Sequence, residues 1–178
     1  MIISKTPLRM SFVGGGSDLP SFYERSEGAV VSTTINKYVY ITTNKKFDDN
    51  IRLSYSKTEN VGRAEKIKHP IVKEVLKKLG ILGGIEITSI ADIPSSGTGL
   101  GSSSAFTVGL LNALHAYNGK FSSPKSLAEQ ACQMEIDILK EPIGRQDQYC
   151  VAHGGFNKLV FHSDHRVGVH PVICSNAT

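Results

Sequence analysis

The chain has 178 residues and carries 20 Lys and Arg against 16 Asp and Glu, a surplus that fits an anionic small ligand but is too weak to indicate nucleic acid. Hydrophobic residues make up 40% and charged residues 20%, a balance that excludes a disordered chain. The first ten residues lack a signal peptide, no stretch is apolar enough to span a membrane, and three scattered cysteines fit a reducing compartment, so we expect a cytoplasmic protein.

Runs of β-branched and aromatic residues dominate the first half of the chain and predict strands. The predicted strands are 2–13, 29–43 (one or two strands), 51–56 and 84–93, with a polar turn at 47–50. Near the end of the chain, 156–161 and 167–172 predict a hairpin.

Predicted helices occupy mostly the second half of the chain. Apolar residues recur at helical spacing in 64–79, and we expect this helix to begin near Pro70, because proline suits a first turn. Further helices are predicted at 105–117 and 122–140, and a short one runs from Pro142 toward His153. Strands first and helices later predict one α+β domain over 1–178.

A glycine- and serine-rich run, Pro94 to Ala105, joins a predicted strand to an apolar helix. Glycine lets the backbone approach a ligand closely, and a helix start directs free amides and a positive dipole end at an anion. A polyphosphate fits this array best. The common P-loop pattern is absent, and Ser102 stands where a dinucleotide loop has its third glycine. A flexible linker is disfavoured because the run adjoins a buried helix.

Two other segments hold polar residues in suggestive positions. Near the N-terminus, Arg9 is followed by three glycines and Asp18, which taken alone indicate a turn and an Asx turn or helix cap. Further on, Glu135 lies in the predicted helix 122–140 and Asp147 lies in the segment 144–149. Taken alone, both acids are ordinary helix-surface carboxylates.

Together, the three segments resemble the kinase superfamily that contains galactokinase, homoserine kinase, mevalonate kinase and phosphomevalonate kinase. Gly99 to Ser103 matches the core of its ATP-phosphate loop, although four residues, not three, separate Pro94 from Gly99, and Ser104 replaces the usual alanine. Near the N-terminus, Gly15-Gly16 replaces the Glu-His of galactokinases. This version is similar to the D-glycero-D-manno-heptose 7-phosphate kinases.

The resemblance implies a role for each matched residue. Asp147 and Arg9 would be catalytic, Ser103 and Glu135 would bind Mg²⁺, and Asp18 would bind sugar hydroxyls. The implied ATP-phosphate residues are Pro94, Gly97, Gly99, Leu100, Gly101, Ser102, Ser103 and Ser104, and the implied substrate residues are Gly15, Gly16, Ser17 and Asp18.

The resemblance also implies a fold shared with a small-subunit ribosomal protein, and a C-terminal ferredoxin-like lobe that this chain lacks. The implied reaction is phosphoryl transfer from MgATP to a sugar or sugar phosphate, most simply to the anomeric hydroxyl of a heptose 7-phosphate. Homo-oligomers are compatible with it, and nucleic acid is not an expected partner. A noncatalytic nucleotide-binding fragment and a basic nucleic-acid-binding module remain the alternatives.

Overall fold

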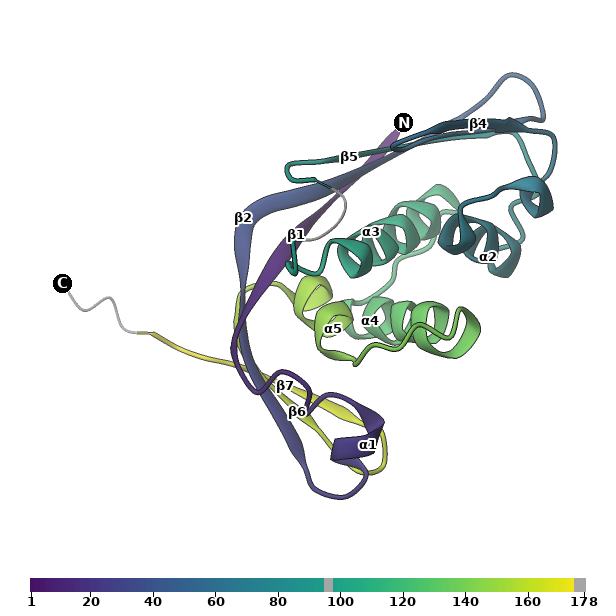
Figure 1. Cartoon of the computed structure of the whole chain (residues 1–178). Coiled ribbons are helices and arrows are strands. Elements are labelled where there is room, and N and C mark those ends of the chain that lie inside the picture. The colour runs from purple at the N-terminus through teal and green to yellow at the C-terminus, as the bar shows by residue number, and fades with distance from the viewer. Residues whose placement is uncertain (95–97, 175–178) are drawn as a thin grey trace.

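A single mixed sheet with helices packed on one face forms the structure, a computed structural model that describes residues 1–94 and 98–174 (Figure 1). The strands are β1 (Ile2–Val13), β2 (Gly28–Lys45), β3 (Ile51–Ser54), β4 (Thr58–Val61), β5 (Ile85–Ala91), β6 (Phe156–Phe161) and β7 (Val167–Pro171). The helices are α1 (Pro20–Tyr23), α2 (Pro70–Lys78), α3 (Ser102–Tyr117), α4 (Pro124–Cys132) and α5 (Gln146–His153), with a 3₁₀ turn at Ala64–Lys66 and a π-helical segment at Gln133–Ile138.

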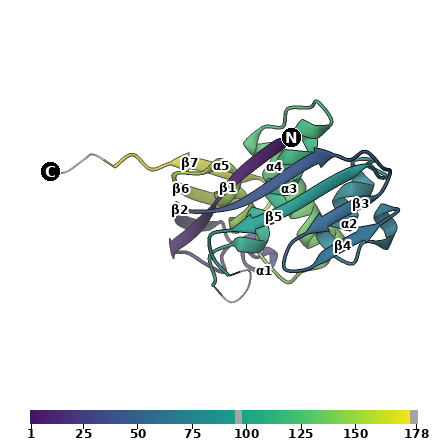
Figure 2. The ribbon, with the colours of Figure 1, turned by 90° about the horizontal axis from the view of Figure 1, so that it is seen from above.

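The strand order in the sheet is β4-β3-β5-β2-β6-β7, and β1 also pairs with β2. Strand β2 therefore pairs with three other strands. β1 runs antiparallel to β2 along most of its length, while β5 pairs with 39–45 and β6 pairs with 28–33 of β2. Figure 2 shows β1, β2 and β5 side by side from above. Among the pairings in the described residues, only β3 with β5 is parallel. The nearly antiparallel sheet confirms the predicted α+β class.

Helix α3 lies at the centre of the helical layer and packs on β1 and β2 (Figure 1). Its mostly apolar sequence buries Leu110, Leu111 and Leu114 completely against Leu8 and Ile41 of the sheet. Burying side chains of this size stabilises the fold by about 2 kcal/mol each. The residues just before α3 are also linked to β1, because the Arg9 amide donates to the Leu100 carbonyl at 3.1 Å.

Most predicted elements are confirmed, with shifted ends. The helix expected near Pro70 begins there, and the expected strand 29–43 is the single strand β2. The helix expected from Pro142 begins only at Gln146, and the helix predicted at 122–140 changes to π-helical hydrogen bonding after Cys132. No helix in the described ranges is long and apolar enough to cross a membrane.

Candidate active site

The first turn of α3 begins at Gly101, the N-cap residue, which has a left-handed φ of 72°. A Cβ at Gly101 would lie 3.2 Å from Arg9 Cγ and 3.3 Å from Asp147 Oδ2, so glycine suits both the backbone and the space. Gly99 and Leu100 precede this turn, and Leu100 packs against the core. Gly97 lies outside the described residues, and Pro94 is exposed at the far side of the loop.

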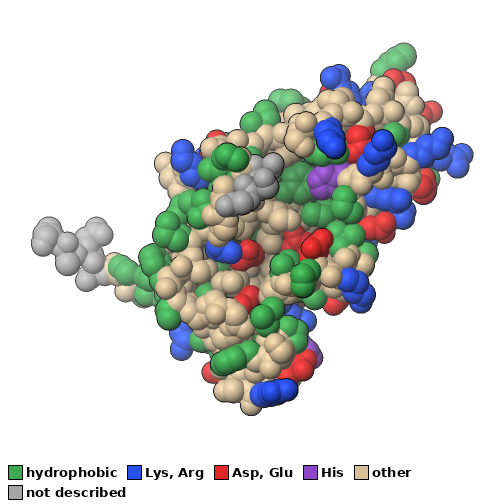
Figure 3. All heavy atoms as spheres, viewed as in Figure 1, with side chains coloured by type: hydrophobic (Ala, Val, Ile, Leu, Met, Phe, Trp, Pro, Cys, Tyr) green, Lys and Arg blue, Asp and Glu red, His purple; other side chains and the backbone are tan. Residues whose placement is uncertain are grey.

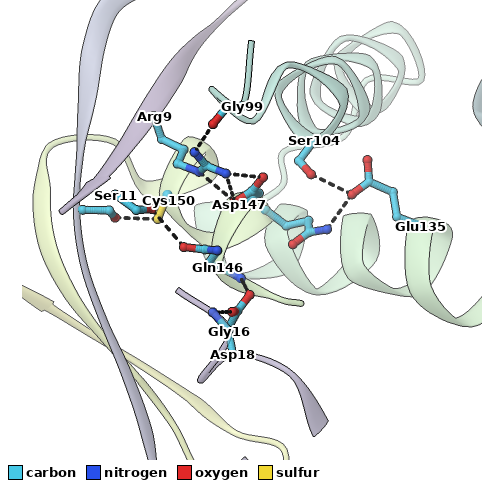
Figure 4. Close-up of polar contacts among 12 residues, drawn as sticks. Arg9, Ser11, Gly16, Asp18, Gly99, Ser104, Glu135, Gln146, Asp147 and Cys150 are labelled. Atoms are coloured by element: carbon cyan, nitrogen blue, oxygen red, sulfur yellow. Dashed lines mark hydrogen bonds and ion pairs between the residues drawn. The ribbon is translucent and has the colours of Figure 1, made fainter. Parts of the chain in front are cut away.

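Arg9 joins the glycine-rich loop to Asp147 (Figure 4). Its Nε donates to Asp147 Oδ1 and its Nη2 to Asp147 Oδ2, both at 2.7 Å, while Nη1 donates to the Gly99 carbonyl at 2.6 Å. A bidentate arginine–carboxylate pair is strong and fixes the orientation of both groups. Arg9 lies in β1 and Asp147 in the first turn of α5, so the sheet, the loop and α5 meet at one point.

Asp147 retains access to solvent, with 23% of its side chain exposed against 12% for Arg9. Burial raises the pKa of the Asp147 carboxyl above its ordinary value, Arg9 acts in the opposite direction, and the Asp18 carboxylate adds to the increase. A half-buried carboxylate held by arginine can accept a proton at a fixed position. In Figure 3, acidic and basic side chains meet in a hollow in the middle of this face.

Glu135 is buried, with 1% exposed, although it lies on a helical segment that the sequence places at the surface. Its carboxylate accepts hydrogen bonds from Thr107 Oγ1 (2.6 Å), Ser104 Oγ (2.8 Å) and Gln148 Nε2 (2.5 Å). No ion pair reaches it within the described residues. Burial therefore raises the pKa of Glu135, and the three neutral donors offset part of that rise.

Ser104 contacts Glu135, whereas Ser103, the serine expected beside Glu135, is exposed and makes no side-chain hydrogen bond to Glu135 among the described contacts. The side-chain oxygen Oε1 of Gln148 is buried and has no hydrogen-bond partner among the described residues. Mg²⁺ prefers oxygen ligands. The Glu135 carboxylate, which has no cationic partner among the described residues, and the Gln148 Oε1 atom beside it therefore fit a hard cation or a water bound to it. The described residues hold no group of three acidic, histidine or cysteine side chains that would bind a metal unaided.

The glycine turn after β1 lies beside Asp147. Gly15 and Gly16 are exposed with no described atom within 4 Å of an added Cβ, which leaves room in front of the turn. Ser17 Oγ instead bonds to the Gly14 carbonyl at 2.7 Å and to Ala29, so its side chain supports the turn. A Cβ at Gly14 would lie 1.9 Å from the Ala29 carbonyl oxygen, which explains why the turn begins with glycine.

Two pockets lie near these motifs, one lined by Asp147 and the other by the start of α3. One, of about 220 Å³, is lined by Gly16, Asp18, Gln146, Asp147 and the 142–144 segment. The other, of about 360 Å³, adjoins Ser102 and Ser103 at the start of α3. Its wall is aromatic: the His69 ring stacks on Phe106 and meets Tyr55 edge-on, with both centroid distances 4.9 Å.

Ser104 was expected at the ATP phosphates and not beside Glu135, and Thr107 and Gln148 were not expected at the site. Ser104 and Thr107 are three positions apart, a helical spacing that places both on one face, and this spacing could have indicated a shared partner. Gln148 directly follows Asp147, but only the fold brings it to Glu135. The aromatic pocket combines Tyr55 after β3, His69 before α2 and Phe106 in α3, and no local pattern indicates it.

Comparison with known proteins gives one family. Residues 65–155 match the family model described as the GHMP kinases N terminal domain. The chain is 31% identical, over 98% of its length, to a D-glycero-alpha-D-manno-heptose 7-phosphate kinase from Campylobacter jejuni, of which it covers 55%.

Solved structures agree with this match. A D-glycero-D-manno-heptose 1-phosphate kinase from Bacteriodes thetaiotaomicron superposes with a TM-score of 0.90 at 26% identity, over 98% of this chain and 61% of that one. The crystal structure of a putative sugar kinase from Campylobacter jejuni gives a TM-score of 0.80 at 28% identity, over 98% of this chain and 56% of that one. The chain thus spans little more than half the length of these relatives. With the match covering residues 65–155, this chain belongs to the GHMP kinases and contains their N-terminal domain.

Proposed function

We propose that this chain is the ATP-binding, N-terminal part of a sugar kinase that transfers the γ-phosphate of ATP to a hydroxyl of a sugar or sugar phosphate. The observation that carries the proposal is the Arg9–Asp147 pair directly beside the left-handed Gly101 turn. A base for the hydroxyl and a helix start for the phosphates are thereby adjacent. In-line phosphoryl transfer needs both to be in place together.

The loop and the start of α3 hold the ATP phosphates in this proposal. The first amides of a helix lack partners within the helix and attract anions. Gly99, Gly101 and Ser102 to Ser104 supply this backbone, and Pro94 and Gly97 belong to the same glycine- and serine-rich run of the sequence. The aromatic pocket of Tyr55, His69 and Phe106 adjoins Ser102 and Ser103, and in this proposal it holds the base of the same nucleotide.

Asp147 accepts the proton of the attacking hydroxyl as the new oxygen–phosphorus bond forms and ADP leaves. Arg9 orients the Asp147 carboxylate and favours its ionised form, because both of its oxygens are bound by one guanidinium. Mg²⁺ held by Glu135 and Ser103 would neutralise charge on the phosphates. Ser104 holds the Glu135 carboxylate in place.

The substrate occupies the pocket beside the glycine turn in this proposal, which Gly16, Asp18 and Asp147 line. Gly15 and Ser17 belong to the same turn and would take part in holding the substrate. The open space before Gly15 and Gly16 suits a bulky, phosphorylated sugar. We infer that the substrate is a heptose phosphate, because two relatives named as heptose phosphate kinases match 98% of the chain. The specific substrate that we infer is D-glycero-D-manno-heptose 7-phosphate, phosphorylated at its anomeric hydroxyl.

We also propose that the complete enzyme includes a C-terminal ferredoxin-like lobe that closes over this site. The length of the relatives supports this. The cytoplasm is the proposed location, since ATP and sugar phosphates are available there, and assembly into homo-oligomers stays a prediction.

The experiment compares this chain with a version that carries the second lobe. Both receive MgATP and a panel of heptose 7-phosphate, heptose 1-phosphate, galactose and mevalonate, with ADP release as the readout. We expect turnover with a heptose phosphate and a loss of at least about 100-fold in Asp147→Asn. Nucleotide binding without any phosphorylated product from the longer version would indicate a noncatalytic nucleotide-binding protein. Salt-sensitive RNA binding without ATP binding would indicate a nucleic-acid module.

A further inference from the structure

Asp18 is almost completely buried, with 2% exposed, yet no cation contacts it within the described residues. Its Oδ1 accepts the amide of Gly16 at 3.0 Å, and its Oδ2 accepts the amide of Gln146 at 3.1 Å. One carboxylate therefore connects the glycine turn after β1 to the start of α5 (Figure 4). These two segments are separated by 128 positions in the sequence.

The chain leaves room for this connection at Gly144. A Cβ on Gly144 would lie 1.9 Å from Asp18 Oδ2 and 3.0 Å from the Asp18 carbonyl oxygen. The Arg145 amide also points to that carbonyl, at 3.4 Å. The segment before α5 thus rests directly on Asp18, and this packing explains why α5 begins at Gln146 instead of at Pro142.

The amide that Asp18 accepts belongs to the first turn of α5. The first amides of a helix lack partners within the helix, and a capping side chain normally comes from the N-cap residue. Here the N-cap residue, Arg145, makes no side-chain cap as far as the structure describes the chain. The Asp18 carboxylate, which lies far away in the sequence, acts as the cap instead. Its negative charge also interacts favourably with the positive end of the helix dipole.

Asp147 is the residue after Gln146, so whatever holds the Gln146 amide holds the backbone of Asp147. We propose that Asp18 is a positioning residue that caps α5 from outside the helix and so fixes Asp147 against Arg9. The role of Asp147 as the base is part of the proposed function, and this inference rests on it. The capping contact itself is a property of the fold and is testable without catalysis.

Steady-state kinetics can distinguish a positioning role of Asp18 from direct binding of the sugar by Asp18. Displacing Asp147 slows the chemical step, because misplacement of a catalytic group by about 1 Å costs about 100-fold in rate. Loss of a sugar ligand that binds ground state and transition state alike raises KM and leaves kcat unchanged. The two roles therefore predict opposite patterns for the same substitution.

Two variants test the cap by different means. Asp18→Asn keeps the size of the side chain but turns an NH₂ group toward one of the two amides. Gly144→Ala keeps the Asp18 carboxylate and forces it away from the Gln146 amide. Asp137→Asn is the matched control, since Asp137 is exposed and accepts no hydrogen bond from an amide of α5 among the described contacts.

The first readout is amide hydrogen exchange at Gly16 and Gln146 in the 178-residue chain. We expect Asp18→Asn and Gly144→Ala to raise the exchange rate of Gln146 by about tenfold or more, and Asp137→Asn to leave it unchanged. The second readout is steady-state kinetics of the longer version with heptose 7-phosphate. We expect kcat to fall about 10- to 100-fold in both test variants, with KM changed less than about threefold.

Each result bears on one of the two ideas. Unchanged Gln146 exchange in a folded Asp18→Asn protein overturns the inference, even where the kinase is active. A raised KM with unchanged kcat in both variants also overturns it and makes Asp18 a sugar ligand only. Raised exchange in a protein that never turns over a sugar phosphate keeps the cap and contradicts the proposed function instead.

Discussion

Ser104 Oγ lies 2.8 Å from Glu135 Oε2, so a serine of the first turn of α3 supports a buried carboxylate from the π-helical segment. Ser103, its neighbour, is exposed and lines the aromatic pocket. Adjacent serines thus have separate surroundings, one inside the fold and one at the aromatic pocket that we propose for the nucleotide.

The pair Ser104→Ala and Ser103→Ala tests this separation. We expect Ser104→Ala to lower the free energy of unfolding by about 1–2 kcal/mol, because Glu135 loses a donor in a buried site. Ser103→Ala changes stability by less than about 0.5 kcal/mol but weakens the thermal shift produced by MgATP. Urea unfolding and thermal shift measure the two effects, and an exchange of the two outcomes would reverse the assignment.

Replacement of Arg9 by lysine removes the planar fork that binds both oxygens of Asp147. Lysine is a point charge and cannot reproduce the bidentate pair or the bond to the Gly99 carbonyl at the same time. We expect kcat to fall by at least about tenfold while the protein stays folded, as measured by ADP release and circular dichroism. Arg166→Lys, at an exposed ion pair with Asp164, is the control and should keep full activity.

The stability of the chain without Mg²⁺ should depend on pH through Glu135. Burial raises the pKa of Glu135 above its ordinary 4.5, so the folded chain binds this proton more tightly than the unfolded chain does. The free energy of unfolding then falls as the pH rises from about 4.5 through the raised folded value.

Glu135→Gln removes this titration. We expect the stability of the variant relative to the natural chain to increase from pH 4 toward pH 7, as followed by urea unfolding at several pH values. Asp137→Asn should show no such trend, since Asp137 is exposed. A parallel pH dependence in Glu135→Gln and the natural chain would assign the effect to another group.

Gly101→Ala should impair the site in addition to lowering stability through the left-handed backbone conformation. Gly101 and Gly80 both have left-handed φ values, 72° and 67°, where alanine costs about 1–2 kcal/mol. At Gly101 the new methyl also meets Arg9 and Asp147, whereas at Gly80 it meets no described atom within 4 Å. We expect similar losses of stability but a loss of MgATP affinity and turnover only in Gly101→Ala, and equal turnover in both would contradict the contact.

The three cysteines should differ in reactivity. Burial raises the pKa of Cys132 to about 12 and that of Cys150 to about 11, while Cys174 is exposed. Because the thiolate is the reactive form, a thiol reagent at pH 8 should modify Cys174 rapidly and the other two only on unfolding. Cys174→Ser should remove the fast phase, and more than one fast equivalent in the folded chain would indicate local opening near α4 or α5.

Local sequence patterns sufficed to predict an element where its structure depends mainly on its own residues. β1, α3 and the start of α2 at Pro70 follow from β-formers, an apolar run and a proline. β4 was missed because its residues, Thr58 to Val61, are mostly polar and their strand state comes from pairing with β3. α1 was missed because four residues are too short to show a period.

The site could be predicted only as separate motifs. Arg9, Gly99 and Asp147 were identified from their motifs, and the structure brings the three together. The burial of Glu135 could not be predicted, because its partners, Ser104, Thr107 and Gln148, come from two other helices. The later start of α5 was missed for a similar reason: it depends on Asp18, far away in sequence.

Arg9 and Asp147 are 138 positions apart in the sequence. Strand β2 likewise pairs with β6, which lies more than 100 positions further along the chain. Contacts this distant form slowly and only after most of the polypeptide is available. During translation the glycine turn and the loop therefore emerge well before α5 exists to receive them. A ribosome-bound chain that stops short of α5 should bind no nucleotide productively, and its unpaired β2 edge is a natural site for chaperone contact or aggregation.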